Sequence, residues 1–424
     1  MEPWLAVAAR RHGPRVALQT PGAATLTYAE LYAQAQRTAG ALGERGVAAG
    51  DRVALALPSV ELVPALHACT LIGAVAVPID LRLRAHERHG RMRDAALVLE
   101  EPVSGEPAAP GDREPAETAT VMFTSGTTAG PKAVRLSYDN WTWNAIGSAL
   151  ALGLDHDERW LCPMPLAHVG GLSIQIRSAV YGTTVVLYDR FETAPVLAGL
   201  SDPAQGITLV SLVPTMLARL LDAGLRNPPS LRWALLGGGP IAPALLERAR
   251  AAGVPVAPSY GMTEACSQIA THGWPLLGTE IRISDEGEVL VRGRTVAESA
   301  LSSDGWLHTG DLGGFDEAGR LEIRGRQADT IITGGENVSP DEVEAILLEH
   351  PGVRDAAVFG RPDSHWGEAV VARIVPVTEP GPTPAELHAH CVARLAPFKV
   401  PKLIELSAEV PRGPTGKLLR RELR

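Results

Sequence analysis

Residues 121–133 read VMFTSGTTAGPKA, an apolar run that leads into a loop of small polar residues. The apolar start predicts the end of a strand. The hydroxyl residues, two glycines and a lysine that follow are typical of a loop that wraps phosphate. Glycines let backbone N–H groups approach an anion, hydroxyls donate hydrogen bonds and Lys132 supplies charge. A Walker A loop is excluded, because Pro131 stands where its second glycine would fall and Ala133 where Ser or Thr would hold magnesium. The stretch alone leaves two interpretations open, a phosphate loop of another kind and an ordinary turn.

The size and charge of the chain narrow its class. Its 424 residues predict two or three domains, with ample apolar content for large cores. Hydrophobic residues make up 45% and charged residues 21%, as in a soluble globular protein. The formal net charge is -9 and no block of lysine and arginine interrupts it, so nucleic acid and anionic membrane are poor candidate partners.

Cysteine usage and the N-terminus predict a cytoplasmic protein. The four cysteines are scattered without a CxxC pair, so we expect neither a disulfide framework nor a zinc site. Met1-Glu2-Pro3-Trp4 lacks the basic and then apolar pattern of a signal peptide. The most apolar stretch, residues 53–79, is interrupted by prolines and polar residues. It predicts a strand, a helix and a strand in a buried core, and not a membrane span.

Apolar β-rich runs alternate with Ala/Leu-rich stretches in the first part of the chain. This alternation predicts parallel sheets covered by helices. The expected strands are residues 52–57, 74–78, 184–188, 207–212 and 233–236, and residues 60–71 are an expected helix. Residues 101–117, rich in Pro, Glu and Gly, predict an exposed connection before the phosphate loop.

The pattern changes after residue 278. Short alternating strands at residues 281–283, 288–291 and 321–323 predict a small antiparallel β region. A helix that starts at Ser339, with acidic residues in its first turn, is expected to follow. Strands at 356–359 and 370–375 and a helix at about 384–395 complete a small α+β unit. The prediction is an α/β protein with two domains. Residues 1–326 would form helix-covered, parallel-rich sheets plus the small β region, and residues 327–424 the α+β domain.

Several polar motifs stand where buried strands are expected to end, which is where ligands bind in open α/β sheets. They read PLAHVGGL (165–172), GGG (237–239), SYGMTE (259–264), WLHTGDL (306–312, where Asp311 follows an expected tight turn), GR (325–326), GGEN (334–337) and PRGPTGK (411–417). Each motif alone has an ordinary explanation: His168 as a core histidine, Glu264 as a solvated carboxylate, Gly416-Lys417 as a surface turn. Their joint occurrence in one order makes that set of explanations improbable.

In this order the motifs resemble those of the adenylate-forming superfamily of acyl-CoA synthetases, peptide-synthetase adenylation domains and luciferases. The resemblance covers nearly the whole chain. It implies a reaction in two halves: a carboxylate attacks the α-phosphate of ATP to give an acyl-adenylate and pyrophosphate, and a thiol then attacks the activated carbonyl. The implied co-substrates are ATP and coenzyme A, with Mg²⁺ as the metal ion.

The resemblance also implies which residues bind the nucleotide. The β- and γ-phosphates would be held by Thr124, Ser125, Gly126, Thr127, Thr128 and Lys132. The adenine would lie against Gly237, Gly238 and Gly239, with Tyr260, next to Gly261, stacked on its ring. Asp311 would accept hydrogen bonds from the ribose hydroxyls, and Arg326 would add a second ribose contact.

Four residues are the implied catalytic set. Thr263 would contact the α-phosphate, and Glu264 would hold Mg²⁺, since a hard cation that bridges phosphates prefers carboxylate oxygen. The apolar loops around His168 and Ser267 would flank the aromatic ring of the acid. Lys417 would reach from the small domain to the forming bond and offset the negative charge that gathers in the transition state.

The small domain is expected to swing between the two halves, with Ala328 or Asp329 as the hinge residue. Lys417 would then leave, and the loop Gly334-Gly335-Glu336-Asn337 would enter to line the thiol tunnel. The phosphate loop departs from the family at Ala129, where a glycine commonly follows the two threonines. If that position needs a positive φ, alanine costs about 1 kcal/mol. We expect weakened or unchanged phosphate binding there, and not loss of activity.

The stretches 140–149, 152–154, 157–161, 168–174 and 258–264, with Ser267-Gln268, resemble one branch of the family, the o-succinylbenzoate–CoA ligases of menaquinone synthesis. That acid carries a second carboxylate, so its pocket would need one cation, for which Arg177 and Arg219 are candidates. Three alternatives stay open: another aryl- or fatty-acid–CoA ligase, an adenylation domain that loads a carrier protein, and a non-catalytic nucleotide binder. Glu264 and Lys417 favour an enzyme, and the lack of a carrier-protein motif favours a free-standing CoA ligase. The expected partners are small molecules, and a homo-oligomer stays open.

Overall fold

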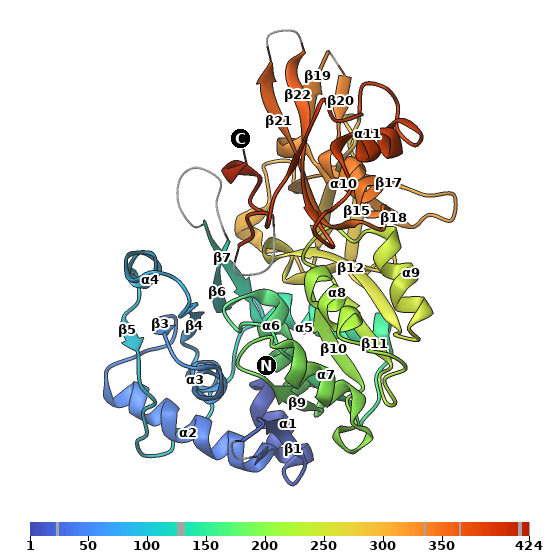
Figure 1. The fold of residues 1–424 in the computed structure, drawn as a ribbon. Coiled ribbons are helices and arrows are strands. Elements are labelled where there is room, and N and C mark those ends of the chain that lie inside the picture. Colours follow the sequence, from blue (N-terminus) through green and yellow to red (C-terminus); the bar gives the residue numbers. More distant parts are fainter. Residues whose placement is uncertain (23–24, 125–131, 335, 364–365, 414–417, 424) are drawn as a thin grey trace.

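The computed structural model of the protein describes residues 1–22, 25–124, 132–334, 336–363, 366–413 and 418–423. Within these ranges the strands form four sheets, one of nine strands, two of five and one of four. The N-terminal segments (blue) and the C-terminal strands (orange and red) lie at opposite ends of the molecule in Figure 1.

The nine-stranded sheet is the centre of the larger part of the chain. Its strands, in spatial order, are β14 (Trp274–Pro275), β13 (Ser267–Thr271), β12 (Val256–Met262), β11 (Trp233–Leu236), β10 (Leu209–Leu212), β8 (Arg159–Cys162), β9 (Thr184–Leu187), β1 (Val16–Gln19) and β2 (Leu26–Thr27). The pairs from β12 to β1 are parallel, and antiparallel pairs close both edges. The parallel strands are short apolar runs, as expected for a sheet that is buried on both faces.

Helices cover both faces of this sheet. Since neighbouring side chains on a strand point to opposite sides, each strand contributes side chains to two cores. Trp160 and Leu235 face a core that includes α1, α2, α3, α5 and α6, whereas Leu161 and Leu236 face a core with α7, α8 and α9. The helices are α1 (Trp4–His12), α2 (Tyr28–Glu44), α3 (Ser59–Ile72), α5 (Tyr138–Leu152), α6 (Val169–Tyr181), α7 (Thr193–Ser201), α8 (Pro214–Asp222) and α9 (Pro243–Ala251). Short 3₁₀ turns are η1 (Pro203–Gln205), η2 (Thr263–Ala265) and η3 (Glu298–Ala300).

A five-stranded sheet packs beside this unit. Its order is β5 (Leu97–Leu99), β3 (Arg52–Leu55), β4 (Val75–Pro78), β6 (Thr118–Thr124) and β7 (Lys132–Ser137), and its pairs are parallel except β6 with β7. One face joins the core of α2 and α3, and the other packs against Met92 of α4 (Ala85–Met92). The strand, helix and strand expected over residues 53–79 are therefore confirmed as β3, α3 and β4. Residues 101–117 form an irregular and mostly exposed connection, as expected.

The small antiparallel β region is also confirmed. It consists of β15 (Thr279–Ile283), β16 (Glu288–Gly293), β17 (Leu307–Phe315) and β18 (Leu321–Arg326) in sequential order. One detail of the prediction was wrong: Asp311 does not follow a tight turn but lies within strand β17. The strand continues past this residue because Asp311 pairs with Arg326 across the ladder to β18.

The C-terminal sheet follows after η4 (Gln327–Asp329). Its path is β20 (Glu336–Val338), β19 (Ile331–Thr333), β22 (Gly367–Pro376) and β21 (Val353–Asp363), and β23 (Leu403–Leu406) adds to β22. Helices α10 (Pro340–Leu348) and α11 (Pro384–Val392) share its core through Val343, Leu347 and Leu387. Ser339 does stand at the start of α10, but its hydroxyl donates to the Arg324 carbonyl at 2.6 Å and does not cap the helix.

The predicted fold class is confirmed: parallel-rich sheets with helices on their faces, a small antiparallel sheet, and an α+β unit at the C-terminal end. In the described ranges, no helix is both long and apolar enough to cross a membrane.

Candidate active site

Strands β6 and β7 bring the two ends of the phosphate loop together. Thr124 and Lys132 are paired directly across the antiparallel ladder, with Thr124 half-buried and Lys132 exposed. The loop thus joins two strands of a hairpin, whereas a Walker A loop joins a strand to a helix. The rest of the loop lies outside the described residues, namely Ser125, Gly126, Thr127, Thr128 and Ala129, and the expectations for these residues stay predictions.

The glycines near the ends of β11 and β12 allow backbone segments to approach closely. A Cβ on Gly237 would lie 2.8 Å from the Ser259 carbonyl oxygen. Gly238 has a φ of +78°, which L side chains rarely adopt, and Gly239 follows it. A Cβ on Gly261 would lie 1.7 Å from the Ser267 carbonyl oxygen. Gly237 and Gly261 are therefore required by the fold itself, in addition to any contact with adenine.

Three residues expected at the nucleotide meet in one cluster. The Tyr260 hydroxyl donates to Asp311 Oδ2 at 2.8 Å, and Arg326 Nε lies 2.8 Å from Asp311 Oδ1. Burial and the negative charge of Asp311 raise the pKa of Tyr260 well above its ordinary value, so the hydroxyl remains a donor. Each carboxylate oxygen has two lone pairs, which leaves Asp311 able to accept from a further hydroxyl.

Thr263 and Glu264 lie in η2, which packs against β6 and β7, the strands that end at Thr124 and begin at Lys132. Both side chains are half-buried. Among the described residues, the Glu264 carboxylate has no hydrogen-bond or ion-pair partner. In that same part of the chain, no three His, Cys, Asp or Glu side chains gather as a metal cage. A lone carboxylate fits Mg²⁺, which usually takes one or two protein carboxylates and its remaining oxygens from phosphate and water.

His168 stands at the N-cap position of α6 and meets two residues that the sequence patterns did not single out. Asp80 is 7% exposed and its Oδ2 lies 3.5 Å from His168 Nε2. Arg82 donates from Nε to Asp80 Oδ1 at 2.8 Å and from Nη2 to Oδ2 at 2.6 Å, and its Nη2 lies 3.3 Å from His168 Nε2. Burial would raise the pKa of Asp80, but the hydrogen bonds from Arg82 and His168 hold it well below its ordinary value.

A signal for this missed pair was present in the sequence. Asp80 and Arg82 follow the buried strand β4 by two and four residues, and charged residues directly after a parallel strand mark the ligand-binding edge. Their contact with His168 could not be predicted, because His168 follows β8, and β4 and β8 belong to different sheets.

The two arginine candidates for a second carboxylate have opposite environments. Arg177 in α6 is 1% exposed, donates to Asn144 Oδ1 from Nε at 3.1 Å and from Nη2 at 2.6 Å, and lies 5.6 Å from the centre of the Trp160 ring. Within the described residues no carboxylate pairs with it, and burial lowers its pKa. Arg219 lies exposed on α8. Arg177 is therefore the better candidate for a buried anion.

Lys417 lies outside the described residues, but the residues on both sides of the segment 414–417 are described. Arg412 and Leu418 form an isolated β-bridge, and the Leu419 N–H donates to the Pro411 carbonyl at 2.9 Å. In the expected tunnel loop, Gly334 has a φ of +58°, Gly335 lies outside the described residues, and Glu336 and Asn337 are exposed at the start of β20.

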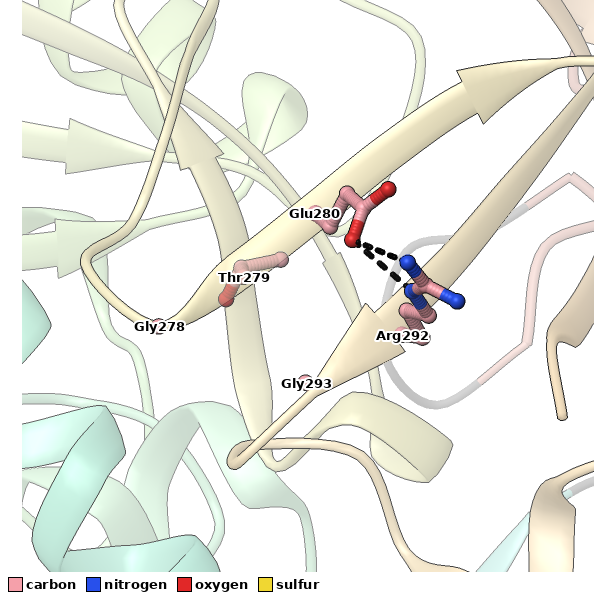
Figure 2. Close-up of a pocket in the computed structure, with 5 residues that line it drawn as sticks. All are labelled: Gly278, Thr279, Glu280, Arg292 and Gly293. Atoms are coloured by element: carbon pink, nitrogen blue, oxygen red, sulfur yellow. Dashed lines mark hydrogen bonds and ion pairs between the residues drawn. The ribbon is translucent and has the colours of Figure 1, made fainter.

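A surface hollow of about 380 Å³ lies between β15 and β16 and is separate from these residues (Figure 2). It is lined by Gly278, Thr279, Glu280, Arg292 and Gly293. The Glu280–Arg292 ion pair, 2.7 Å long, already satisfies the two charges in it. None of the residues expected at the nucleotide or the acid lines the hollow, so it is a surface feature and not the active site.

Comparison with known families matches most of the chain. The model described as AMP-binding enzyme matches residues 5–99 and 98–299, and the model described as AMP-binding enzyme C-terminal domain matches residues 342–417. A 2-succinylbenzoate–CoA ligase from Bacillus licheniformis is 40% identical over 457 residues, which cover 94% of each chain. The relative from Bacillus subtilis is 38% identical and covers 94% of this chain and 93% of its own.

Solved structures of the o-succinylbenzoate CoA synthetase (MenE) from Bacillus subtilis are similar as well. The complex with the acyl-adenylate intermediate OSB-AMP and the complex with ATP and magnesium ion both have a TM-score of 0.91 and 37% identity, and cover 100% of this chain and 98% and 99% of theirs. A double mutant bound to the product analogue OSB-NCoA has the same identity and covers 100% and 98%, but its TM-score is 0.72. The present structure is thus closer to the OSB-AMP and ATP complexes than to the product-analogue complex.

Proposed function

Since the chain belongs to the AMP-binding enzyme family, we propose that it converts 2-succinylbenzoate, ATP and coenzyme A into 2-succinylbenzoyl-CoA, AMP and diphosphate, a step of menaquinone biosynthesis. The observation that carries this proposal is the 40% identity to a 2-succinylbenzoate–CoA ligase over 94% of both chains. The protein is accordingly an acid–thiol ligase of the AMP-forming type, and its substrates are small molecules.

In the first half-reaction a carboxylate oxygen of the acid forms a bond to the α-phosphorus of ATP, and pyrophosphate leaves. Thr124, Lys132 and the loop between them hold the β- and γ-phosphates. The cluster of Tyr260, Asp311 and Arg326 supports this proposal, because it offers a buried carboxylate, already oriented by two donors, to the ribose hydroxyls. Thr263 contacts the α-phosphate, and Lys417 stabilises the charge that develops on it.

Mg²⁺, bound at Glu264, would neutralise phosphate charge and stabilise the departing pyrophosphate. The half-buried position of Glu264 in η2 supports this assignment, because η2 packs against β6 and β7, the two strands that flank the phosphate loop.

In the second half-reaction the sulfur of coenzyme A forms a bond to the activated carbonyl, AMP leaves, and the thiol proton passes to solvent. We assign the division between the two moving parts to residues 326 and 327, with Ala328 or Asp329 as the hinge. The change of sheet across η4 supports this division, because β18 belongs to the four-stranded sheet and β19 to the C-terminal sheet. After the swing, Glu336 and Asn337 take the place of Lys417.

The second carboxylate of the acid is assigned to Arg177. A buried guanidinium without a counter-ion is unfavourable, and a bound carboxylate relieves this cost through two parallel hydrogen bonds. Asn144 orients the guanidinium from one side without neutralising it. His168, at the N-cap of the same helix, flanks the aromatic ring of the acid. We also propose a cytoplasmic location, since all four cysteines are buried free thiols that suit a reducing compartment.

The test is pyrophosphate release over a panel of carboxylic acids, with and without coenzyme A. Rapid release with 2-succinylbenzoate, and thioester formation once coenzyme A is added, are expected. Turnover only with long-chain or simple aryl acids would move the protein to another ligase of the family. Adenylate formation without thioester formation would favour a domain that loads a carrier protein. Nucleotide binding without release for any acid would favour a non-catalytic binder.

A further inference from the structure

Arg420, in the terminal turn η5 (Arg420–Glu422), is surrounded by carboxylates from two elements. Its side chain is 11% exposed. Nη1 donates to Asp329 Oδ2 at 3.0 Å, Nη2 donates to Glu344 Oε2 at 2.8 Å and to Asp341 Oδ1, and Nε donates to the Val358 carbonyl at 3.2 Å. A single guanidinium thus ties the end of the chain to η4, α10 and β21.

Asp329 differs from the other partners in its place in the chain. It lies in η4, the segment through which the chain passes from the four-stranded sheet to the C-terminal sheet, whereas Asp341, Glu344 and Val358 lie within the C-terminal unit. Arg420 itself follows Lys417 by three residues. The bond between Asp329 and Arg420 therefore connects the proposed hinge to the segment that carries the catalytic lysine.

The exposed fractions of the three carboxylates indicate which of their ion pairs with Arg420 is broken most easily. Glu344 is 11% exposed and Asp341 is 20% exposed, whereas Asp329 is 28% exposed. A more exposed ion pair exchanges with water at lower cost. Of its three carboxylate partners, Asp329 is therefore the one that Arg420 can release at the lowest cost.

The residues before Lys417 are also bound to the C-terminal unit. Arg412 donates from Nη2 to Asp355 Oδ1 at 2.7 Å and from Nε to Oδ2 at 3.1 Å, and it forms the β-bridge to Leu418. The segment that carries Lys417 is therefore held at both flanks to the C-terminal unit. Asp329 contacts this segment from the proposed hinge, and the bond from the Ser339 hydroxyl to the Arg324 carbonyl is a further contact between the C-terminal unit and β18.

We propose that Arg420 is a positioning residue: its bond to Asp329 locks the hinge in the arrangement that presents Lys417 for adenylation, and the bond is released for thioester formation. This inference rests on the proposed two-step function, and it adds a residue pair that selects between the two steps.

The primary test is Asp329→Asn in the full chain, with the two half-reactions measured separately. Adenylation is followed by pyrophosphate release from 2-succinylbenzoate and ATP, and thioester formation by supplying the acyl-adenylate and coenzyme A. The kcat of adenylation should fall about three- to tenfold with unchanged KM values, while thioester formation is unchanged or faster. Glu349→Gln, which alters an exposed carboxylate paired with Arg394 at 3.5 Å, should leave the ratio of the two rates unchanged.

A second variant separates positioning from simple stabilisation. Arg420→Met should shift the same ratio, and the double variant Asp329→Asn/Arg420→Met should shift it no further than Arg420→Met alone. If Arg420→Met does not fold, Asp329→Asn decides the question by itself. Equal losses in both half-reactions, or a lower melting temperature with an unchanged ratio, would overturn the proposal. A wild-type protein that releases no pyrophosphate with any acid would instead refute the proposed function.

Discussion

Arg177 and Arg420 are both largely buried, but their surroundings are opposite. Arg177 donates to the neutral amide of Asn144 and has no carboxylate partner in the described part of the chain. Arg420 donates to three carboxylates. Burial lowers the pKa of Arg177, whereas the burial of Arg420 is outweighed by Glu344, Asp341 and Asp329, which raise its pKa.

This difference separates two uses of a buried cation. A guanidinium without a counter-ion is costly in the ligand-free protein, and the cost is explained if a substrate supplies the anion. A guanidinium with three carboxylates needs no ligand, and it binds protein to protein. Arg177 thus fits a cation that recognises substrate, and Arg420 one that sets the position of its own domain.

The largest expected effect concerns the domain that Arg420 positions. Lys417→Ala should lower the rate of adenylation by about 10²–10³, because a charge aimed at the transition state is lost. Thioester formation from supplied acyl-adenylate should be spared, since the proposed swing removes the lysine from the site before this step. Lys402→Ala, an exposed lysine of the same domain, is the matched control for both rates. Equal losses in the two half-reactions would contradict the swing of the C-terminal domain between the two steps. They would also contradict the role proposed for Arg420, which depends on this swing.

Arg177 is tested by a change of substrate preference. Arg177→Met should lower kcat/KM for 2-succinylbenzoate about 100-fold, because the ring carboxylate loses a charge-assisted pair. The rate with 4-oxo-4-phenylbutanoate, which lacks the ring carboxylate, should change much less, so the preference between the two acids narrows. Arg177→Lys should retain part of the preference, and Arg219→Met, on the exposed face of α8, should leave it intact. If Arg177→Met affected both acids alike, the arginine would be a core residue without a role in substrate recognition.

The carboxylates around Arg420 predict a dependence of stability on pH. Burial raises the pKa of Glu344 from 4.5 to about 7, a shift that Arg420 opposes and Asp341 reinforces. Because the folded state binds this proton more tightly, the contribution to stability is complete below pH 4.5 and is lost as the pH rises through 7. Glu344→Gln removes the contribution. The free energy of unfolding of the variant minus that of the wild type should therefore rise by on the order of 2–3 kcal/mol between pH 5 and pH 8.

Urea unfolding at both pH values measures this difference. Taking the variant relative to the wild type cancels other titrating groups, such as His67, whose pKa is lowered to about 4 by burial. Glu349→Gln, at an exposed site, should give a flat difference. A flat difference for Glu344→Gln as well would mean that the carboxyl group titrates normally in the folded protein.

The strands and helices of the fold could be predicted from the sequence to different degrees. Strands β3, β4 and β11 and helix α3 follow from apolar runs bounded by turn residues, because burial on both faces leaves a clear signal in the sequence. The position of Asp311 inside β17 did not follow, because only the pairing with β18 shows that the strand continues through this residue.

The candidate site divides in the same way. Tyr260, Asp311 and Arg326 were expected near one ligand, and the structure brings them into direct contact. Contacts between sheets, such as Asp80 with His168, and between distant segments, such as Asp329 with Arg420, depend on the tertiary arrangement and leave no local pattern. Whether Arg177 or Arg219 is buried also depends on which face of a helix meets the core, and only the structure separates the two.

Asp80 offers a third arrangement to set beside Arg177 and Arg420, one carboxylate shared by Arg82 and His168. Asp80→Asn should lower kcat/KM for the acid about tenfold, because an amide cannot replace the charge that holds His168 in place. Asp94→Asn, whose carboxylate is 76% exposed beside Arg52, is the matched control.

The double variant Asp80→Asn/His168→Ala should lose no more activity than His168→Ala alone if Asp80 acts through the histidine. Additive losses would instead assign Asp80 to Arg82 and mean that His168 acts independently of Asp80.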